Sequence, residues 1–183
     1  MSRLPEVDPA TATGEAAAVL HQVQASFGAI PNMAKVMATS PALLRAYLAM
    51  AEALAGGVLS AGVRERLAIT AAETNECGYC LSAHTYIGAN IVGVDAEELE
   101  SARSGASADP HIGAILDLSR ALLAQHGKVD DETWERARSL GVTDAEVGEV
   151  VGHVAINVLT NYFNLLTRVE NEWPVVSTRV DAA

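Results

Sequence analysis

The chain has 183 residues, of which 23 are Asp or Glu and 12 are Lys or Arg, so its formal net charge at pH 7 is −11. This charge argues against nucleic acid or an anionic lipid surface as a partner, because binding to phosphate groups needs clustered cations. Hydrophobic residues make up 50% of the chain and charged residues 19%, a composition typical of a folded globular protein. We therefore expect no nucleic-acid partner and no membrane partner.

The amino-terminal segment and the cysteine content indicate a location. No basic region followed by an apolar run opens the sequence, so no signal peptide is predicted. No apolar stretch reaches the roughly 18 residues that a membrane-spanning helix needs. Only two cysteines are present, Cys77 and Cys80, which is too few for a secreted disulfide scaffold. The sequence predicts a cytoplasmic protein.

Apolar residues recur at intervals of three and four along the chain, and strand signals are nearly absent, which predicts an all-α fold. The residues that suit helix starts are, in chain order, Ser40, Ser60, Asp95, Asp109 and Thr143. The glycines that suit helix ends are Gly56, Gly105, Gly127 and Gly141. These helix start and end signals predict a single domain over residues 1–183 with about eight or nine helices. We expect loosely ordered tails at residues 1–10 and 175–183.

The segment CGYCLSAH holds the residues best suited to chemistry. Cys77, Cys80 and His84 are spaced so that on a continuous helix they share one face. Two helical residues three apart have Cα atoms about 5 Å apart, a distance that a disulfide tolerates. Such a bond closes a very short loop and adds little stability, so reversible redox chemistry explains the pair better than structure does.

A thiol becomes nucleophilic when its pKa falls toward neutral pH, and two nearby features favour that change. A helix start near Cys77 would place partial positive charge beside the thiols, and His84 could accept a proton from Cys80. The imidazole then needs a carboxylate partner. Glu65 and Glu73 both precede the motif, and spacing alone does not choose between them.

Other interpretations of the same residues stay open. Cys77, Cys80 and His84 with Glu65 or Glu73 could bind zinc, although structural zinc sites usually draw on two separated ligand pairs. A thioredoxin-like site lacks the βαβ context that it needs. A polar stripe on the last long helix either bonds to neighbouring helices or another subunit, or lines a pocket; it consists of Glu149, His153, Asn157, Asn161 and Arg168.

The run RERLAITAAETNECGYCLSAH resembles the alkylhydroperoxidase D-like families of the carboxymuconolactone decarboxylase superfamily, whose signature is a Glu, then C-x-x-C, then three residues and His. The flanking runs FGAIPNMAKVMATSPALLRAYLAM and HVAINVLTNYFNLLTRVENEWP are similar to helices of the peroxidase-related members. The resemblance extends over roughly residues 27–175. It implies an all-helical fold, a homo-oligomer (trimer or hexamer) and a peroxidase without a cofactor or metal.

The resemblance also implies roles for residues. Cys80 corresponds to the cysteine that attacks the peroxide, Cys77 to the resolving cysteine, and His84 with Glu65 to the proton relay. Tyr79 departs from the pattern, since well-studied members have His at this position, which predicts a simpler relay. The substrate implied is a small organic hydroperoxide, and the reductant a dithiol such as a lipoyl-bearing protein. The alternatives are a dithiol–disulfide oxidoreductase and a helical oligomer whose cysteines only sense oxidation.

Overall fold

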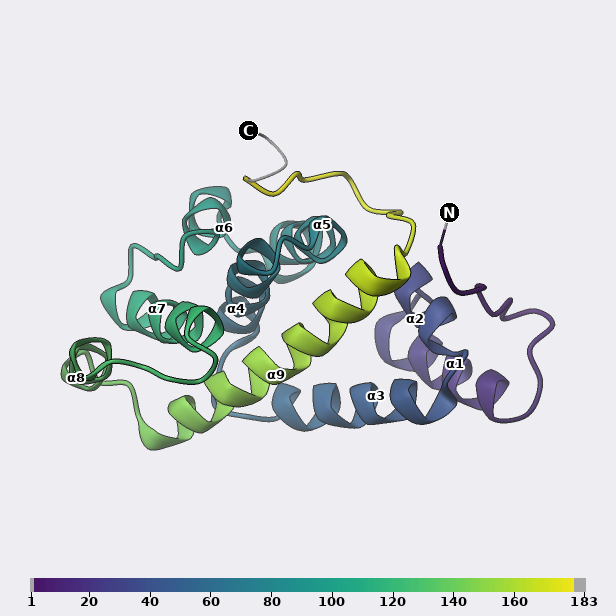
Figure 1. The fold of residues 1–183 in the computed structure, drawn as a ribbon, viewed down its shortest axis with the longest axis horizontal. Helices are drawn as coiled ribbons and strands as arrows, with labels where there is room; N and C mark the ends of the chain where they lie inside the picture. The colour runs from purple at the N-terminus through teal and green to yellow at the C-terminus, as the bar shows by residue number, and fades with distance from the viewer. Residues whose placement is uncertain (1, 180–183) are drawn as a thin grey trace.

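A computed structural model describes residues 2–179 of the chain as a bundle of α-helices, with no strand in that range (Figure 1). The all-α prediction, including the number of helices, is confirmed. Within residues 2–179, nine α-helices and one π-helix follow one another: α1 (Gly14–Phe27), α2 (Asn32–Met37), α3 (Pro41–Ala55), α4 (Ala61–Thr74), α5 (Gly78–Ile87), η1 (Gly88–Val92), α6 (Ala96–Ala102), α7 (Pro110–Ala124), α8 (Asp131–Ser139) and α9 (Asp144–Thr167).

The helix starts follow the capping residues of the sequence. Ser40, Ser60, Asp95 and Asp109 each accept a hydrogen bond from a backbone N–H in the first turn of α3, α4, α6 and α7. At α9, Thr143 and Glu146 bond reciprocally in a capping box. Local hydrogen bonding therefore fixes where these helices begin.

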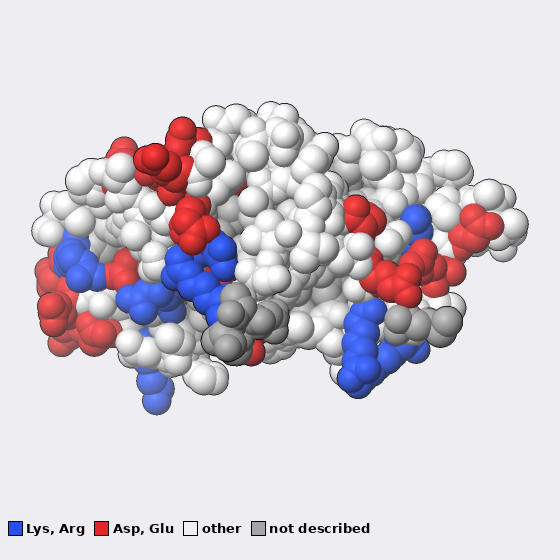
Figure 2. Space-filling view, turned by 90° about the horizontal axis from the view of Figure 1, so that it is seen from above, with Lys and Arg blue, Asp and Glu red and all other residues white. Residues whose placement is uncertain are grey.

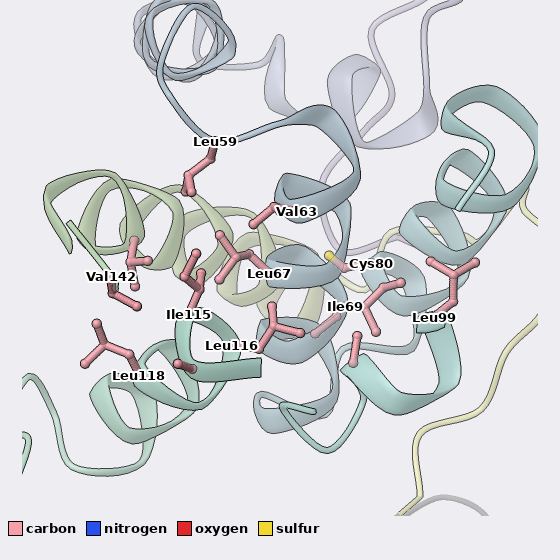
Figure 3. Packing of buried hydrophobic residues seen from close by; sticks show 14 of the residues in the cluster. Leu59, Val63, Leu67, Ile69, Cys80, Leu99, Ile115, Leu116, Leu118 and Val142 are labelled. Atoms are coloured by element: carbon pink, nitrogen blue, oxygen red, sulfur yellow. The ribbon is translucent and has the colours of Figure 1, made fainter. Parts of the chain in front are cut away.

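Helix α4 lies at the centre of one half of the molecule and packs against α5, α7 and α9. The core around it is made of apolar side chains from these helices and from α6 and α8, and it includes Cys80 (Figure 3). Cys77 belongs to the same core. A second core forms where α1, α2 and α3 meet. Helix α9 runs diagonally across the molecule and contacts α3 as well as α4, so it connects the two cores (Figure 1).

A tight turn joins α4 to α5 and places the cysteines. Glu76 adopts a left-handed conformation with φ of 57°, and the Cys77 N–H bonds to the Ala72 carbonyl at 2.8 Å. This pattern closes the end of α4 and turns the chain back along it. Cys77 therefore precedes α5 as its N-cap residue, with extended dihedral angles, and does not share a continuous helix with Cys80.

Helix α5 continues into the π-helix η1, and Gly88 at this junction is buried. A Cβ atom at Gly88 would lie 2.8 Å from Leu99 of α6 and 3.7 Å from the Cβ of Glu65 in α4. The absence of a side chain thus lets three helices approach one another beside Glu65. Such π-helical insertions recur at functional sites.

Both terminal segments contact the bundle. The Arg3 N–H bonds to the carbonyl of Thr167 at 2.6 Å, and Ser82 on α5 accepts hydrogen bonds from Asn171 and from the backbone of Val176. Residues 180–183 of the expected loose tail lie outside the described part.

No helix among residues 2–179 is long and apolar enough to cross a membrane. On the face shown in Figure 2, basic side chains lie close to acidic ones.

The capping box of α9 gives a test of this fold. Replacing Thr143 by Ala removes the side-chain bond to the Glu146 N–H and should lower the free energy of unfolding by about 1 kcal/mol. Thr13 is the matched control, because it occupies the N-cap position of α1 without a side-chain bond. In chemical denaturation, Thr13→Ala should lower the free energy of unfolding clearly less than Thr143→Ala does. An equal decrease in both variants would contradict the role of the cap.

Candidate active site

The two cysteines are reduced and hydrogen-bonded to each other. The Cys77 Sγ donates to the Cys80 Sγ over 3.0 Å. Their exposed fractions are 1% and 3%, so the bond is shielded from water. Cys80 lies in the first turn of α5, where the partial positive charge of the helix end favours an anion.

The bond between the sulfurs makes the two thiols unequal. The hydrogen bond from Cys77 has the largest effect on the pKa of Cys80 and lowers it. Burial acts in the opposite direction. The hydrogen bonds from Cys77 and Asn164 and the charge of His84 outweigh burial and lower the pKa of Cys80 to about 7. The pKa of Cys77 moves upward, first because its side chain hydrogen-bonds to Cys80 and then because it is buried. Cys80 is therefore the thiol that ionises near neutral pH, and Cys77 remains protonated beside it.

One turn beyond Cys80, His84 pairs with Glu65. The His84 Nδ1 lies 2.8 Å from the Glu65 Oε2, and their side chains keep 27% and 17% of their surfaces exposed. Burial disfavours the imidazolium, but the charge of Glu65 and its hydrogen bond outweigh burial, so the pKa of His84 is raised. The pair can hold a proton next to the sulfurs.

Glu73, the other acidic residue that the spacing left open, is engaged elsewhere. Its carboxylate accepts a hydrogen bond from the Arg103 Nε at 2.7 Å and another from the backbone N–H of Arg179. The geometry thus brings Glu65 and not Glu73 to His84.

No hydrogen bond joins His84 to Cys80 among residues 2–179, although the charge of each favours the charged form of the other. Proton transfer between them therefore needs a group that bridges the imidazole and the sulfur. A water molecule or a bound substrate with a transferable hydrogen meets this need.

Cys80, His84 and Glu65 line a cavity of about 460 Å³. Its walls come from α1 to α5, η1 and α9 and are mainly apolar, with Phe27 and Ile91 among the exposed apolar residues beside it. A cavity of this size and lining fits an organic molecule whose reactive group reaches the sulfur.

Two tyrosines also line this cavity. The Tyr79 hydroxyl accepts a hydrogen bond from the Met33 N–H and donates one to Glu172, and burial raises its pKa. Tyr79 thereby ties α2 and the carboxyl-terminal segment to α5. Burial, aided by the charges of Cys80 and Glu65, raises the pKa of Tyr47 to about 12.

Some residues of the polar stripe on α9 hold neighbouring segments in place, and others line the cavity. Glu149 accepts hydrogen bonds from the backbone of Val58 and Leu59 at 2.6 and 2.9 Å and so fixes the turn before α4. His153 and Asn157 line the cavity. The pKa of His153 is lowered, chiefly by burial, and its Nε2 has no hydrogen-bond partner in the described part of the chain.

The remaining stripe residues differ from one another. The Asn161 Oδ1 accepts a hydrogen bond from Asn75, next to the cysteine turn. Arg168 ends α9 in a left-handed conformation. Asn164, which the sequence pattern missed because it lies outside the four-residue spacing, donates from its Nδ2 to the Cys80 Sγ over 3.1 Å.

A metal site was the other interpretation of these residues. Within the described range, no group of three or more His, Cys, Asp or Glu side chains is arranged to hold a metal ion.

These features define an all-helical protein with a buried dithiol and an acid–base pair at the wall of an apolar cavity. The family model of the carboxymuconolactone decarboxylase family matches residues 41–124, which include the cysteines, His84 and Glu65. Residues 41–124 thus match the carboxymuconolactone decarboxylase family, and the structural matches below show the alkylhydroperoxidase D-like fold over nearly the whole chain, as the sequence resemblance predicts. A comparison with curated proteins found no match.

Solved structures share the fold over nearly the whole chain. An uncharacterized peroxidase-related protein from Ralstonia eutropha JMP134, described as an alkylhydroperoxidase AhpD core, is 25% identical with a TM-score of 0.80, over 93% of this chain and 92% of that one. An uncharacterized peroxidase-related protein from Silicibacter sp. TM1040 is 24% identical with a TM-score of 0.77, over 91% and 88%. The debrominase Bmp8 is 18% identical with a TM-score of 0.76, over 91% and 90%.

The pairing of Glu65 with His84 gives a test that needs no substrate. Glu65→Gln removes the negative charge beside the imidazole, so the pKa of His84 should fall, as followed by its ring resonances in a nuclear magnetic resonance titration. Glu73→Gln is the matched control and should leave the His84 titration in place, because Glu73 pairs with Arg103. An equal effect of both variants would contradict the assignment of Glu65.

Proposed function

We propose that this protein is a thiol-dependent peroxidase that reduces organic hydroperoxides through a cycle between the dithiol and the disulfide of Cys77 and Cys80. The observation that carries the proposal is the unequal dithiol: one buried sulfur with a pKa lowered to about 7, bonded to a second thiol at 3.0 Å, at the wall of a cavity. A peroxidase of this kind needs a thiolate to attack and a thiol in reach to resolve.

In the first step, the Cys80 thiolate attacks the distal oxygen of the hydroperoxide. The O–O bond breaks and an S–O bond forms, so sulfur loses two electrons and the peroxide gains them. Cys80 becomes a sulfenic acid, and the leaving alkoxide takes a proton from the His84 imidazolium to depart as an alcohol. Glu65 favours that imidazolium before the step and orients its ring.

In the second step, the Cys77 sulfur attacks the Cys80 sulfur. An S–S bond forms, the S–O bond breaks, and the sulfenic hydroxyl leaves as water with the proton of the Cys77 thiol. The charge on Cys80 is among the causes that raise the pKa of Cys77. Because the first step removes that charge, Cys77 becomes easier to ionise only after Cys80 has reacted, which sets the order of events.

The disulfide needs an external dithiol to return to the reduced state, and a lipoyl-bearing protein is a reductant of suitable chemistry. No organic cofactor or metal is required by these steps. A reducing compartment such as the cytoplasm would keep the pair ready for the next cycle. We also propose a homo-oligomer, since α9 carries exposed apolar side chains at Val151, Tyr162, Leu165 and Leu166.

The stoichiometry of the reaction tests the function. Mixing the reduced protein with one equivalent of an organic hydroperoxide should consume two thiols per chain and release one alcohol. Cys80→Ser should abolish the reaction, and Cys77→Ser should stop at a sulfenic acid that a dimedone-type reagent traps. Glu65→Gln should slow the reaction by about a hundredfold or more. Unchanged peroxide consumption by Cys80→Ser would overturn the proposal.

A second candidate function uses the same dithiol. The volume of the cavity, about 460 Å³, is sufficient for a substituted aromatic ring. The structurally similar Bmp8 is a debrominase of which an alanine variant has been solved in complex with 2,3,4-tribromopyrrole. Here the Cys80 thiolate would take bromine from carbon, the ring would gain a proton, and Cys77 would displace bromide to form the disulfide. Bromide release from a bromopyrrole with no reaction toward hydroperoxides would favour this function.

Two further alternatives use the same pair of cysteines. Turnover with disulfides alone would favour a dithiol–disulfide oxidoreductase. Oxidation of the cysteines without turnover would favour a sensor of oxidation.

A further inference from the structure

Two asparagine amides of α9 lie at the reactive cysteine. Asn164 contacts the Cys80 Sγ directly, with its Nδ2 at 3.1 Å. Asn161 precedes it by one turn on the same face of the helix. Both residues are buried, with exposed fractions of 4% for Asn164 and 0% for Asn161.

Each amide keeps one buried atom without a hydrogen bond. The Asn161 Nδ2, a donor, and the Asn164 Oδ1, an acceptor, have no partner in the described part of the chain. Buried polar atoms are nearly always paired, and leaving one unpaired is costly. The two unpaired atoms lie on neighbouring turns beside a sulfur that changes its charge and composition during the proposed reaction. We therefore expect them to gain hydrogen-bond partners when Cys80 is in another chemical state.

We propose that Asn161 and Asn164 form an amide cradle that binds the reacting group of Cys80, first as thiolate and then as sulfenic acid. This inference rests on the proposed function and adds two residues to it. A thiolate accepts N–H donors, and Asn164 already supplies one. A sulfenic acid carries one O–H donor and an oxygen that accepts. The unpaired donor of Asn161 and the unpaired acceptor of Asn164 match these two needs.

The electrostatic effect of the two amides agrees with this role. The hydrogen bond from Cys77 has the largest effect on the pKa of Cys80, burial opposes it, and the hydrogen bond from Asn164 comes next. Both Asn164 and Asn161 lower this pKa. Fixed amide dipoles cost no reorganisation when charge develops on the sulfur, which is the property of a preorganised site.

A purely structural role for Asn161 is the main alternative. Its Oδ1 accepts a hydrogen bond from the Asn75 Nδ2 at 2.9 Å and so ties α9 to the turn before Cys77. The two roles use different atoms of the same amide. Asn161→Asp keeps an oxygen for Asn75 and removes the donor, so it separates them.

The test measures the thiol of Cys80 in a Cys77→Ser background, where serine keeps a hydroxyl donor at position 77. The rate of alkylation by iodoacetamide against pH gives the pKa of Cys80 without any peroxide. Asn164→Leu should raise that pKa by about one unit, a tenfold loss of thiolate below neutral pH, because a hydrogen bond to a charged group is lost. Asn161→Asp should also raise it, but the added carboxylate would do so without any cradle, so the lifetime of the sulfenic acid is the deciding readout for this variant.

Thr167→Val is the matched control, since Thr167 is buried on the same helix and its hydroxyl bonds to the Phe163 carbonyl, away from the cysteines. This variant should leave the pKa of Cys80 unchanged. A second readout is the lifetime of the sulfenic acid, followed by trapping after one equivalent of cumene hydroperoxide. In both asparagine variants the sulfenic acid should be trapped or overoxidised several times faster than in the Cys77→Ser parent.

The outcomes are distinguishable. If the parent forms no sulfenic acid but the asparagine variants raise the pKa, the proposed function fails and the thiolate part of the cradle stands. If the parent forms sulfenic acid and neither asparagine variant changes the pKa or the lifetime beyond the Thr167→Val control, the cradle is overturned and the function stands. If Asn164→Leu does not fold, as judged by circular dichroism, the lifetime of the sulfenic acid in Asn161→Asp decides: a lifetime equal to that of the Cys77→Ser parent overturns the cradle.

Discussion

The hydrogen bond between the two buried sulfurs is the interaction on which this site depends. A thiolate in an apolar core is unfavourable unless donors surround it, and the Cys77 thiol is the nearest donor, at 3.0 Å. The bond lowers the pKa of one cysteine and raises that of the other. One contact therefore makes one sulfur more acidic than the other while keeping both within reach of a disulfide, and the proposed cycle uses this difference for attack and resolution.

The fold surrounds this contact in a specific way. The left-handed Glu76 turns α5 back along α4, so that Cys77 ends the turn and Cys80 lies in the first turn of the helix. Helix α4 supplies Glu65 to His84, and Gly88 keeps the neighbouring helices close enough for that pairing. Helix α9 supplies the amide that contacts the sulfur. Each of these elements contributes one donor, charge or dipole to the same small volume.

Much of this arrangement could be predicted from the sequence, because it is local. Helix starts follow from capping side chains such as Ser60 and Thr143, and the Cys80–His84 spacing follows from one helical turn. What could not be predicted depends on long-range packing. The left-handed turn at Glu76 carries no glycine signal, and Asn164 contacts Cys80 from a position 84 residues further along the chain. The spacing alone does not choose between Glu65 and Glu73; the family resemblance favours Glu65, and the structure pairs Glu73 with Arg103.

The central claim is that Cys80 is a thiolate near neutral pH while Cys77 stays a thiol. The most direct test is a pH titration of thiolate ultraviolet absorbance in the reduced protein and in each single Cys→Ser variant. We expect one thiol to titrate at a pKa of about 7 and to be lost in Cys80→Ser, with the other titrating well above the range of an ordinary cysteine. Two thiols that both titrate at the ordinary value, or a low pKa that survives in Cys80→Ser, would contradict the account.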